Sequence, residues 1–107
     1  MPRSIIGKDS EILKNRVEWL QEEFPTDKPV RVQRTDKIIT ADCQEFKDHY
    51  LIRIANNPDP YTVLVMFLLH EWAHALEPNG MEHSPAFWNT LGEISNADEA
   101  YEAGFYD

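Results

Sequence analysis

The sequence predicts an α+β fold in which one helix is followed by three strands and then by two helices. Apolar residues spaced by three and four in residues 9–24 predict the first helix. Alternating apolar and polar residues predict strands between residues 30 and 55, and a long apolar run from residue 61 predicts another helix. Because 107 residues fit one domain, we expect a single domain over residues 1–107 with the order α-β-β-β-α-α.

Residues 9–24 have the pattern of an amphipathic helix. The apolar positions are separated by four, three and four residues and therefore share one face: Leu13, Val17, Leu20 and Phe24. Asp9 or Ser10 can cap the start, and Pro25 stops the helix.

Three strands are expected next. Residues 30–34 (VRVQR) alternate apolar and polar side chains, as in a half-buried strand. Residues 37–46 (KIITADCQEF) are rich in β-branched residues but less regular. Residues 49–55 (HYLIRIA) place alternate apolar side chains on one face. Three short strands in succession suggest a three-stranded, mainly antiparallel meander.

A buried helix is expected from residue 60 to about residue 76. Asp59 can cap its start, and Pro60 fits the first helical position, where a missing N–H costs nothing. The segment is apolar nearly all round, so we expect it at the centre of the fold.

The last helix is expected to start at Ser84 and Pro85, which repeat the cap-then-proline pattern. Phe87, Leu91 and Ile94 then form its apolar stripe. A separate short helical turn is expected over residues 98–103. Aromatic residues at helical spacing are common in cores, so Trp72 and Trp88 are both expected to be buried.

His70, Glu71 and His74 form an HExxH motif on the predicted buried helix. Helix positions i and i+4 share a face, so both imidazoles can point at one metal ion. Glu71 lies about 100° round the helix from His70 and can flank the ion without binding it. Polar groups inside an apolar helix would be costly to bury, whereas a bound Zn²⁺ would compensate them.

A catalytic zinc site usually has three protein ligands and an open position, so a third ligand is needed. His83 is the best candidate, because residues 78–80 (PNG) can turn the chain back toward the first two histidines. Glu77 lies about 10 Å along the helix axis from His70, which is too far unless the helix unwinds. Glu82 and Glu93 remain weaker alternatives.

The composition excludes several classes of function. A formal net charge of −9 with scattered Lys and Arg makes nucleic-acid binding unexpected without a partner. The single cysteine, Cys43, cannot form an internal disulfide and is expected to be half-buried in a strand. The N-terminus lacks the apolar core of a signal peptide, and the apolar run 61–69 is far shorter than the ~18 residues that cross a bilayer. We expect a cytoplasmic protein without membrane association.

With HEWAH at residues 70–74 and HSPAFW at residues 83–88, the chain resembles the SprT-like and YgjP-like zinc metallopeptidases. The resemblance implies a minimal zincin-like fold, with His70, His74 and His83 as zinc ligands and Glu71 as the catalytic acid/base. It also implies that the sheet edge nearest the HExxH helix pairs with an extended peptide. The C-terminal zinc ribbon and basic region that many SprT-like proteins use on DNA are absent from the sequence.

The main functional hypothesis is a zinc-dependent endopeptidase that acts on a protein or peptide substrate. A zinc-bound water, activated by Glu71, would attack the peptide bond. The alternative is a non-catalytic regulatory protein that retains zinc, and a third possibility is a peptidase that needs an adaptor to deliver its substrate.

Overall fold

The computed structural model describes residues 3–4, 7–56, 61–77 and 83–102. Its helices and strands, in chain order, are β1 (Arg3–Ser4), α1 (Gly7–Glu23), β2 (Val30–Thr35), β3 (Ala41–Glu45), β4 (Tyr50–Ala55), α2 (Tyr61–Leu76) and α3 (Pro85–Glu102). The predicted α+β class is confirmed. The short strand β1 was not predicted, and it places a strand before the first helix.

The sheet is mixed, with the strand order β1-β2-β4-β3. β2 pairs with β4 in parallel, whereas β3 pairs with β4 antiparallel. The predicted meander is therefore wrong, because β4 lies between β2 and β3. The physical reason is burial: Tyr50, Ile52 and Ile54 of β4 are all fully buried, and a central strand provides that environment. β3 carries Asp42 and Gln44 and takes the edge, where polar strands are tolerated.

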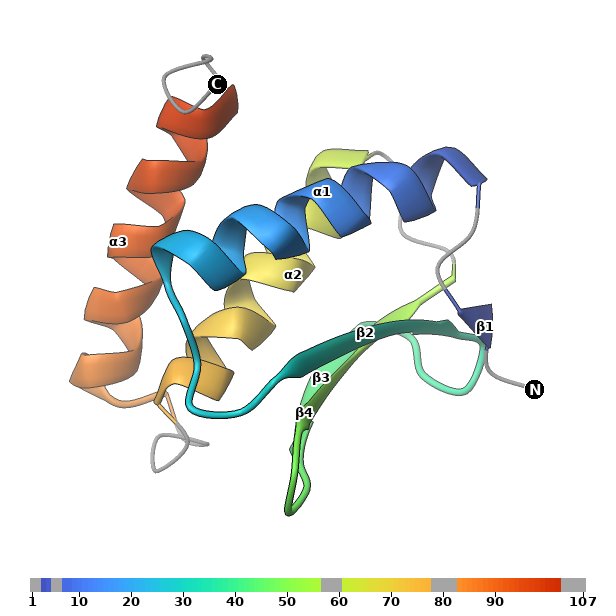
Figure 1. The fold of residues 1–107 in the computed structure, drawn as a ribbon, viewed down its shortest axis with the longest axis horizontal. Coiled ribbons are helices and arrows are strands. Elements are labelled where there is room, and N and C mark those ends of the chain that lie inside the picture. Colours follow the sequence, from blue (N-terminus) through green and yellow to red (C-terminus); the bar gives the residue numbers. More distant parts are fainter. Residues whose placement is uncertain (1–2, 5–6, 57–60, 78–82, 103–107) are drawn as a thin grey trace.

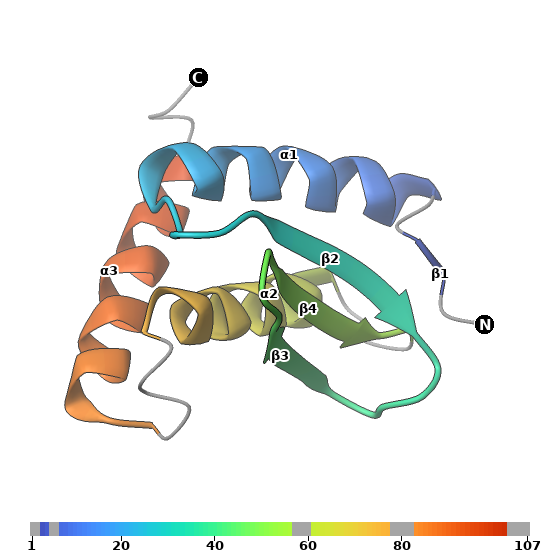
Figure 2. The same ribbon diagram turned by 60° about the horizontal axis from the view of Figure 1, so that its bottom comes forward.

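The helices α1 and α2 lie on the same side of the sheet, and α3 stands across their end (Figure 1). The view in Figure 2 shows α1 running above β2 while α2 passes behind β3 and β4. One apolar core joins all three helices to β4, and its largest members include Leu13, Leu20, Ile52, Ile54, Leu68, Trp72 and Phe87. The predicted inner faces of residues 9–24 and 49–55 are confirmed. Their apolar residues belong to this core or pack against it, and Tyr50 is fully buried beside them in the strand.

Ion pairs of the buried Arg16 side chain join α1 to α3. The Arg16 side chain is only 3% exposed and forms ion pairs with Asp98 and Glu102. Its guanidinium carbon also lies 4.4 Å from the centre of the Tyr101 ring. α3 runs without a break to Glu102, so residues 98–102 of the predicted separate turn belong to it, and Ala103 lies outside the described residues.

The helix α2 is the central helix, as predicted, although it is not buried on every side. Leu64, Leu68 and Trp72 are fully buried, but Met66 is 66% exposed. The predicted start at Asp59 and Pro60 lies outside the described residues. Among the helices that the structure describes, none has the length and apolar character needed to cross a membrane.

Candidate metal centre

Three histidines from two separate segments meet at one end of α2. His70 and His74 lie one turn apart on α2, and His83 stands two residues before the first residue of α3. One ring nitrogen from each histidine lies within 4.8 Å of the others. The Nε2 atoms of His70 and His83 are 3.2 Å apart. The structure thus brings together the three histidines that the sequence analysis named.

One pair of these nitrogens is spaced like two ligands of a tetrahedral metal ion. With Zn–N distances of about 2.0–2.1 Å, two ligand nitrogens of a tetrahedral zinc lie about 3.3–3.4 Å apart. The His70–His83 pair, at 3.2 Å, is close to this value. The third nitrogen, at most 4.8 Å from the others, needs to approach by no more than about 1.4 Å.

The cluster is open on one side, and its burial and neighbours favour the neutral form of His70. His74 is buried, His70 is half-buried and His83 is exposed, so solvent can reach the donors from the His83 side. Burial lowers the pKa of His70, and the neighbouring His74 and His83 lower it further. A metal binds the neutral imidazole, so this environment keeps His70 in the form that binds.

The start of α3 holds His83 in place. The Ser84 hydroxyl accepts a hydrogen bond from the Phe87 N–H at 3.2 Å, which is the predicted N-cap. The Ser84 carbonyl accepts the first helical bond, from the Trp88 N–H at 3.1 Å. His83 is therefore joined directly to a capped helix start. The predicted PNG turn lies outside the described residues.

Phe87 and Trp88 support the three imidazole rings. Phe87 is fully buried, and its ring centre lies 5.0, 4.3 and 4.9 Å from those of His70, His74 and His83. Trp88 stacks on His83 with ring centres 5.4 Å apart. The prediction that Trp88 is buried is wrong, because it is 52% exposed beside the site. The spacing of four between His83 and Phe87 could have indicated the contact that the sequence analysis missed.

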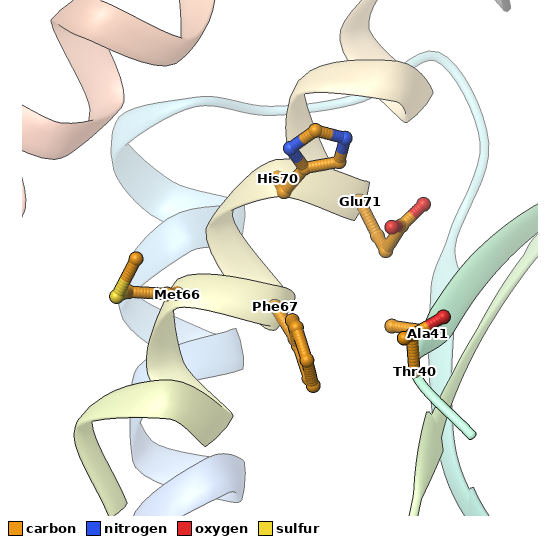
Figure 3. A pocket seen from close by; sticks show the side chains of 6 residues that line it. All are labelled: Thr40, Ala41, Met66, Phe67, His70 and Glu71. Atoms are coloured by element: carbon orange, nitrogen blue, oxygen red, sulfur yellow. The ribbon is translucent and has the colours of Figure 1, made fainter. Parts of the chain in front are cut away.

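Glu71 lies next to the histidines on the side of α2 that faces β3. Its side chain extends from α2 into the space between the helix and the segment that carries Ala41 (Figure 3). Burial raises the pKa of Glu71 to about 7, and the Asp42 carboxylate contributes to the rise. A bound cation would lower this pKa, because it favours the carboxylate. The protonation state of Glu71 near neutral pH therefore depends on whether a cation is bound beside it.

Two cavities that share Ala41, His70 and Glu71 adjoin the cluster. The first, here called the metal hollow, has a volume of about 290 Å³ and is lined by Ala41, Asp42, Cys43, His70, Glu71, His74 and His83. The second, here called the side pocket, has a volume of about 360 Å³ and is lined by Thr40, Ala41, Met66, Phe67, His70 and Glu71. Both cavities lie between α2 and the edge strand β3, and the sequence analysis did not predict either.

Cys43 is half-buried in a strand, as predicted, and it also lines the metal hollow. Burial raises the pKa of its thiol to about 12, and the carboxylates of Glu71, Asp42 and Glu45 add to the rise. The thiol is therefore neutral at physiological pH. Among the described residues, the donor atoms that gather within 4.8 Å belong to the three histidines and do not include the Cys43 sulfur.

The other candidate ligands lie elsewhere. Glu77 follows the last residue of α2, and Glu93 is exposed on α3. Neither carboxylate belongs to the histidine group. Glu82 lies outside the described residues. The three histidines are thus the metal-ligand group that the described structure offers.

Comparisons with protein-family models, with curated proteins and with solved structures found no match for this chain. The resemblance to SprT-like and YgjP-like peptidases remains a prediction from HEWAH and HSPAFW. The function is therefore inferred from the residues of the site.

Proposed function

We propose that this chain is a zinc-dependent peptidase of the SprT-like and YgjP-like kind, with a zincin-like fold. The observation that carries the proposal is the convergence of His70, His74 and His83, with donor nitrogens within 4.8 Å of one another. Glu71 lies directly beside these donors and lines the same hollow. A purely structural zinc site would not need this carboxyl group, and such sites are usually closed by four protein ligands.

The three histidines would hold the ion and leave one position for water or substrate. When bound, Zn²⁺ would supply a Lewis acid that polarises the peptide carbonyl and lowers the pKa of a water molecule. Glu71 would accept a proton from the attacking water and pass it to the leaving amine nitrogen. Phe87 would exclude water beneath the rings and keep the imidazoles in position.

The edge of β3 supports an extended peptide as the substrate. The Thr40 carbonyl accepts a hydrogen bond from the Ala55 N–H, and the Phe46 N–H donates to the His49 carbonyl, both at 2.8 Å. In an antiparallel pair these bonds occur at alternate residues, so the even-numbered residues of β3 bond to β4.

The odd-numbered residues, Ala41, Cys43 and Glu45, therefore direct their backbone groups away from β4. In the sheet of the described residues, β3 has a neighbour on one side only. The backbone groups that point away from β4 belong to residues of which Ala41 and Cys43 line the metal hollow. A peptide that pairs with this edge would pass in front of the histidines and Glu71.

The proposal is tested by zinc content and peptide hydrolysis measured on the same preparations. Wild-type protein should bind about one zinc per chain and hydrolyse an unfolded protein substrate. Glu71→Gln should retain the zinc and lose roughly 10²–10⁴-fold in rate, as expected for loss of a general acid/base. Glu77→Gln, just beyond α2, is the matched control and should keep both properties.

The result that would refute the mechanism is normal hydrolysis by zinc-loaded Glu71→Gln. Zinc binding by wild type without any hydrolysis would instead support the non-catalytic regulatory protein. Hydrolysis that appears only after addition of cell extract would support the adaptor-dependent peptidase.

A further inference from the structure

The face of the sheet that points away from α1 and α2 carries a cavity with no role in the proposed mechanism. Val30 and Val32 of β2 pack against the core, and Ile52 of β4 is fully buried in it. Successive side chains of a strand point to opposite faces, so the residues between these lie on the outer face. β2 pairs in parallel with β4 and places Arg31 beside Leu51. The two side chains therefore lie next to each other on the outer face.

This cavity, here called the outer pocket, has a volume of about 330 Å³ and is lined by Arg31, Val32, Gln33, His49 and Leu51. It shares no lining residue with the metal hollow or the side pocket. Its volume is near the lower end of small-molecule sites, which suits a compact ligand. The outer pocket is therefore a candidate binding site that is separate from the metal centre.

The polar side chains of the outer pocket include no carboxylate. Arg31 carries five N–H donors in a planar fork, and the Gln33 amide can also donate. In the part of the chain that the structure describes, Arg16 and Arg53 pair with carboxylates, whereas Arg31 forms no ion pair. A guanidinium fork that lines a cavity and has no carboxylate partner of its own is a candidate binding group for an anion.

The His49 ring lies at the end of the turn between β3 and β4. It stacks on the Phe46 ring, with ring centres 4.8 Å apart and an angle of 8° between the planes. Its Nδ1 atom lies 2.7 Å from a carboxylate oxygen of Asp48. These two contacts orient the ring and leave Nε2 as the nitrogen that can bind a ligand. An imidazolium in this position donates to Asp48 from Nδ1 and to a ligand from Nε2.

The charges around the outer pocket match a ligand with one negative charge better than one with two. Arg31 supplies one permanent positive charge, and the charge of a protonated His49 is balanced by Asp48. The hydrogen bond with His49 lowers the pKa of Asp48, and the Arg31 charge contributes, so Asp48 stays negative at neutral pH. A guanidinium binds a carboxylate through two parallel hydrogen bonds. Leu51 adds an apolar surface for the uncharged part of the ligand.

We propose that the outer pocket binds an organic monocarboxylate that carries a short aliphatic chain. Arg31 would hold the carboxylate, and the Gln33 amide and Nε2 of His49 would donate further hydrogen bonds to it. The aliphatic chain would lie against Leu51. The carboxylate belongs either to a free acid or to the C-terminus of a peptide, because the two present the same chemistry to these donors. The pocket is separate from the metal centre, so carboxylate binding does not depend on peptidase activity.

The first test follows the amide signals of ¹⁵N-labelled protein, with one equivalent of zinc added, during titration with 3-methylbutanoate or with its uncharged analogue 3-methylbutanamide. The acid should shift the signals of residues 31–33 and 49–51 and bind at least about tenfold more tightly than the amide. Equal binding of the two compounds would overturn the proposal. Shifts confined to residues that line the metal hollow would show that the acid binds the zinc, and they would overturn it too. Tighter binding of inorganic phosphate than of the acid would refute the choice of a carboxylate.

Arg31→Gln tests the residue that is assigned to the carboxylate. Arg31 is exposed on β2, so the variant should fold, and its affinity for 3-methylbutanoate should fall by roughly 10–100-fold. Lys37→Gln is the matched control, because it removes the same charge from an exposed residue outside the outer pocket, and it should bind the acid like wild type. Unchanged affinity in Arg31→Gln, or equal weakening in both variants, would overturn the proposal. The comparison of acid with amide uses wild type and needs neither variant.

N-acetyl-leucine, with N-acetyl-leucinamide as its uncharged control, distinguishes the two sources of the carboxylate. N-acetyl-leucine presents its carboxylate as the C-terminus of a peptide does. Tighter binding of N-acetyl-leucine than of 3-methylbutanoate would support the site and assign it to a peptide C-terminus. Weaker binding would support the site and assign it to a free acid. Absence of binding by both acids would overturn the proposal.

Discussion

Replacement of Phe87 by leucine separates the folding role of this residue from its support of the metal ligands. Phe87 is fully buried, and its ring centre lies 4.3–5.0 Å from those of all three histidines. Leucine keeps the site apolar but removes the flat surface against which the imidazoles pack. The stability loss should be about 1–2 kcal/mol, below the 3–5 kcal/mol typical of phenylalanine to alanine. The variant should therefore remain folded.

The larger expected effect of this substitution is on zinc affinity. Groups that orient metal ligands without binding the metal typically contribute about 10–100-fold to affinity. Phe87→Leu should weaken zinc binding by a factor in this range, because three imidazoles lose one common support. The control is Ile94→Val, since Ile94 is also fully buried on α3 but lies about 10 Å further along the helix. It should cost about 0.5–1.5 kcal/mol of stability and leave zinc affinity unchanged.

The assay combines urea unfolding of the metal-free variants with zinc competition against a chromogenic chelator. If Phe87→Leu loses stability but binds zinc as tightly as wild type, the ring has only a core role. If Ile94→Val weakens zinc binding equally, the effect reports general loosening of α3, and the reasoning about ring contacts is refuted.

Three further predictions follow from the described contacts. Asp98→Ala removes one of the two carboxylates that pair with the buried Arg16 charge. The free energy of unfolding measured by urea titration should therefore fall by about 3 kcal/mol. An unchanged value would show that Glu102 and the Tyr101 ring are sufficient to stabilise the Arg16 charge. Burial and neighbouring carboxylates raise the Cys43 pKa to about 12, which leaves little of the reactive thiolate at pH 8. The Cys43 thiol of the folded protein should therefore react with an aromatic disulfide roughly 10³-fold more slowly than that of the protein unfolded in urea. As pH rises above about 8.5 the unfolded thiol releases its proton first, so stability should fall toward pH 12 and Cys43→Ala should remove that fall. Ser84→Ala removes the α3 cap and should lower the free energy of unfolding by about 1 kcal/mol and weaken zinc binding. Ser84→Asp keeps a capping oxygen and should retain the stability and the zinc affinity of wild type. Equal zinc affinity in the two variants would contradict the role of the cap in holding His83.

Apart from β1, the helices and strands were predictable because each has a local pattern. The spacing of Leu13, Val17 and Leu20 and the alternation in residues 50–54 predicted faces that are buried in the structure. The sheet order was not predictable from these patterns. The parallel pairing of β2 with β4 depends on which strand is buried enough to take the central position in the sheet, and the whole core determines that.

The histidine group was predictable because HExxH requires only helical spacing, and a histidine beside a capped helix start is held in a fixed direction. The residues that surround the histidine group were not predictable. Trp88 has the same helical spacing as a core residue, yet it is exposed because α3 presents it toward His83 and solvent. Cys43 and Ala41 reach the site only because β3 becomes the edge strand nearest α2, which follows from the sheet order.

X-ray absorption at the zinc edge, measured on wild-type protein loaded with one equivalent of zinc, tests the central claim most directly. The proposal predicts four light ligands at about 2.0–2.1 Å, of which three show the scattering pattern of imidazole. His83→Ala should reduce the imidazole number to two. A sulfur shell at about 2.3 Å, which would place Cys43 on the ion, or a site with four protein ligands and no water would contradict the proposed open three-histidine centre.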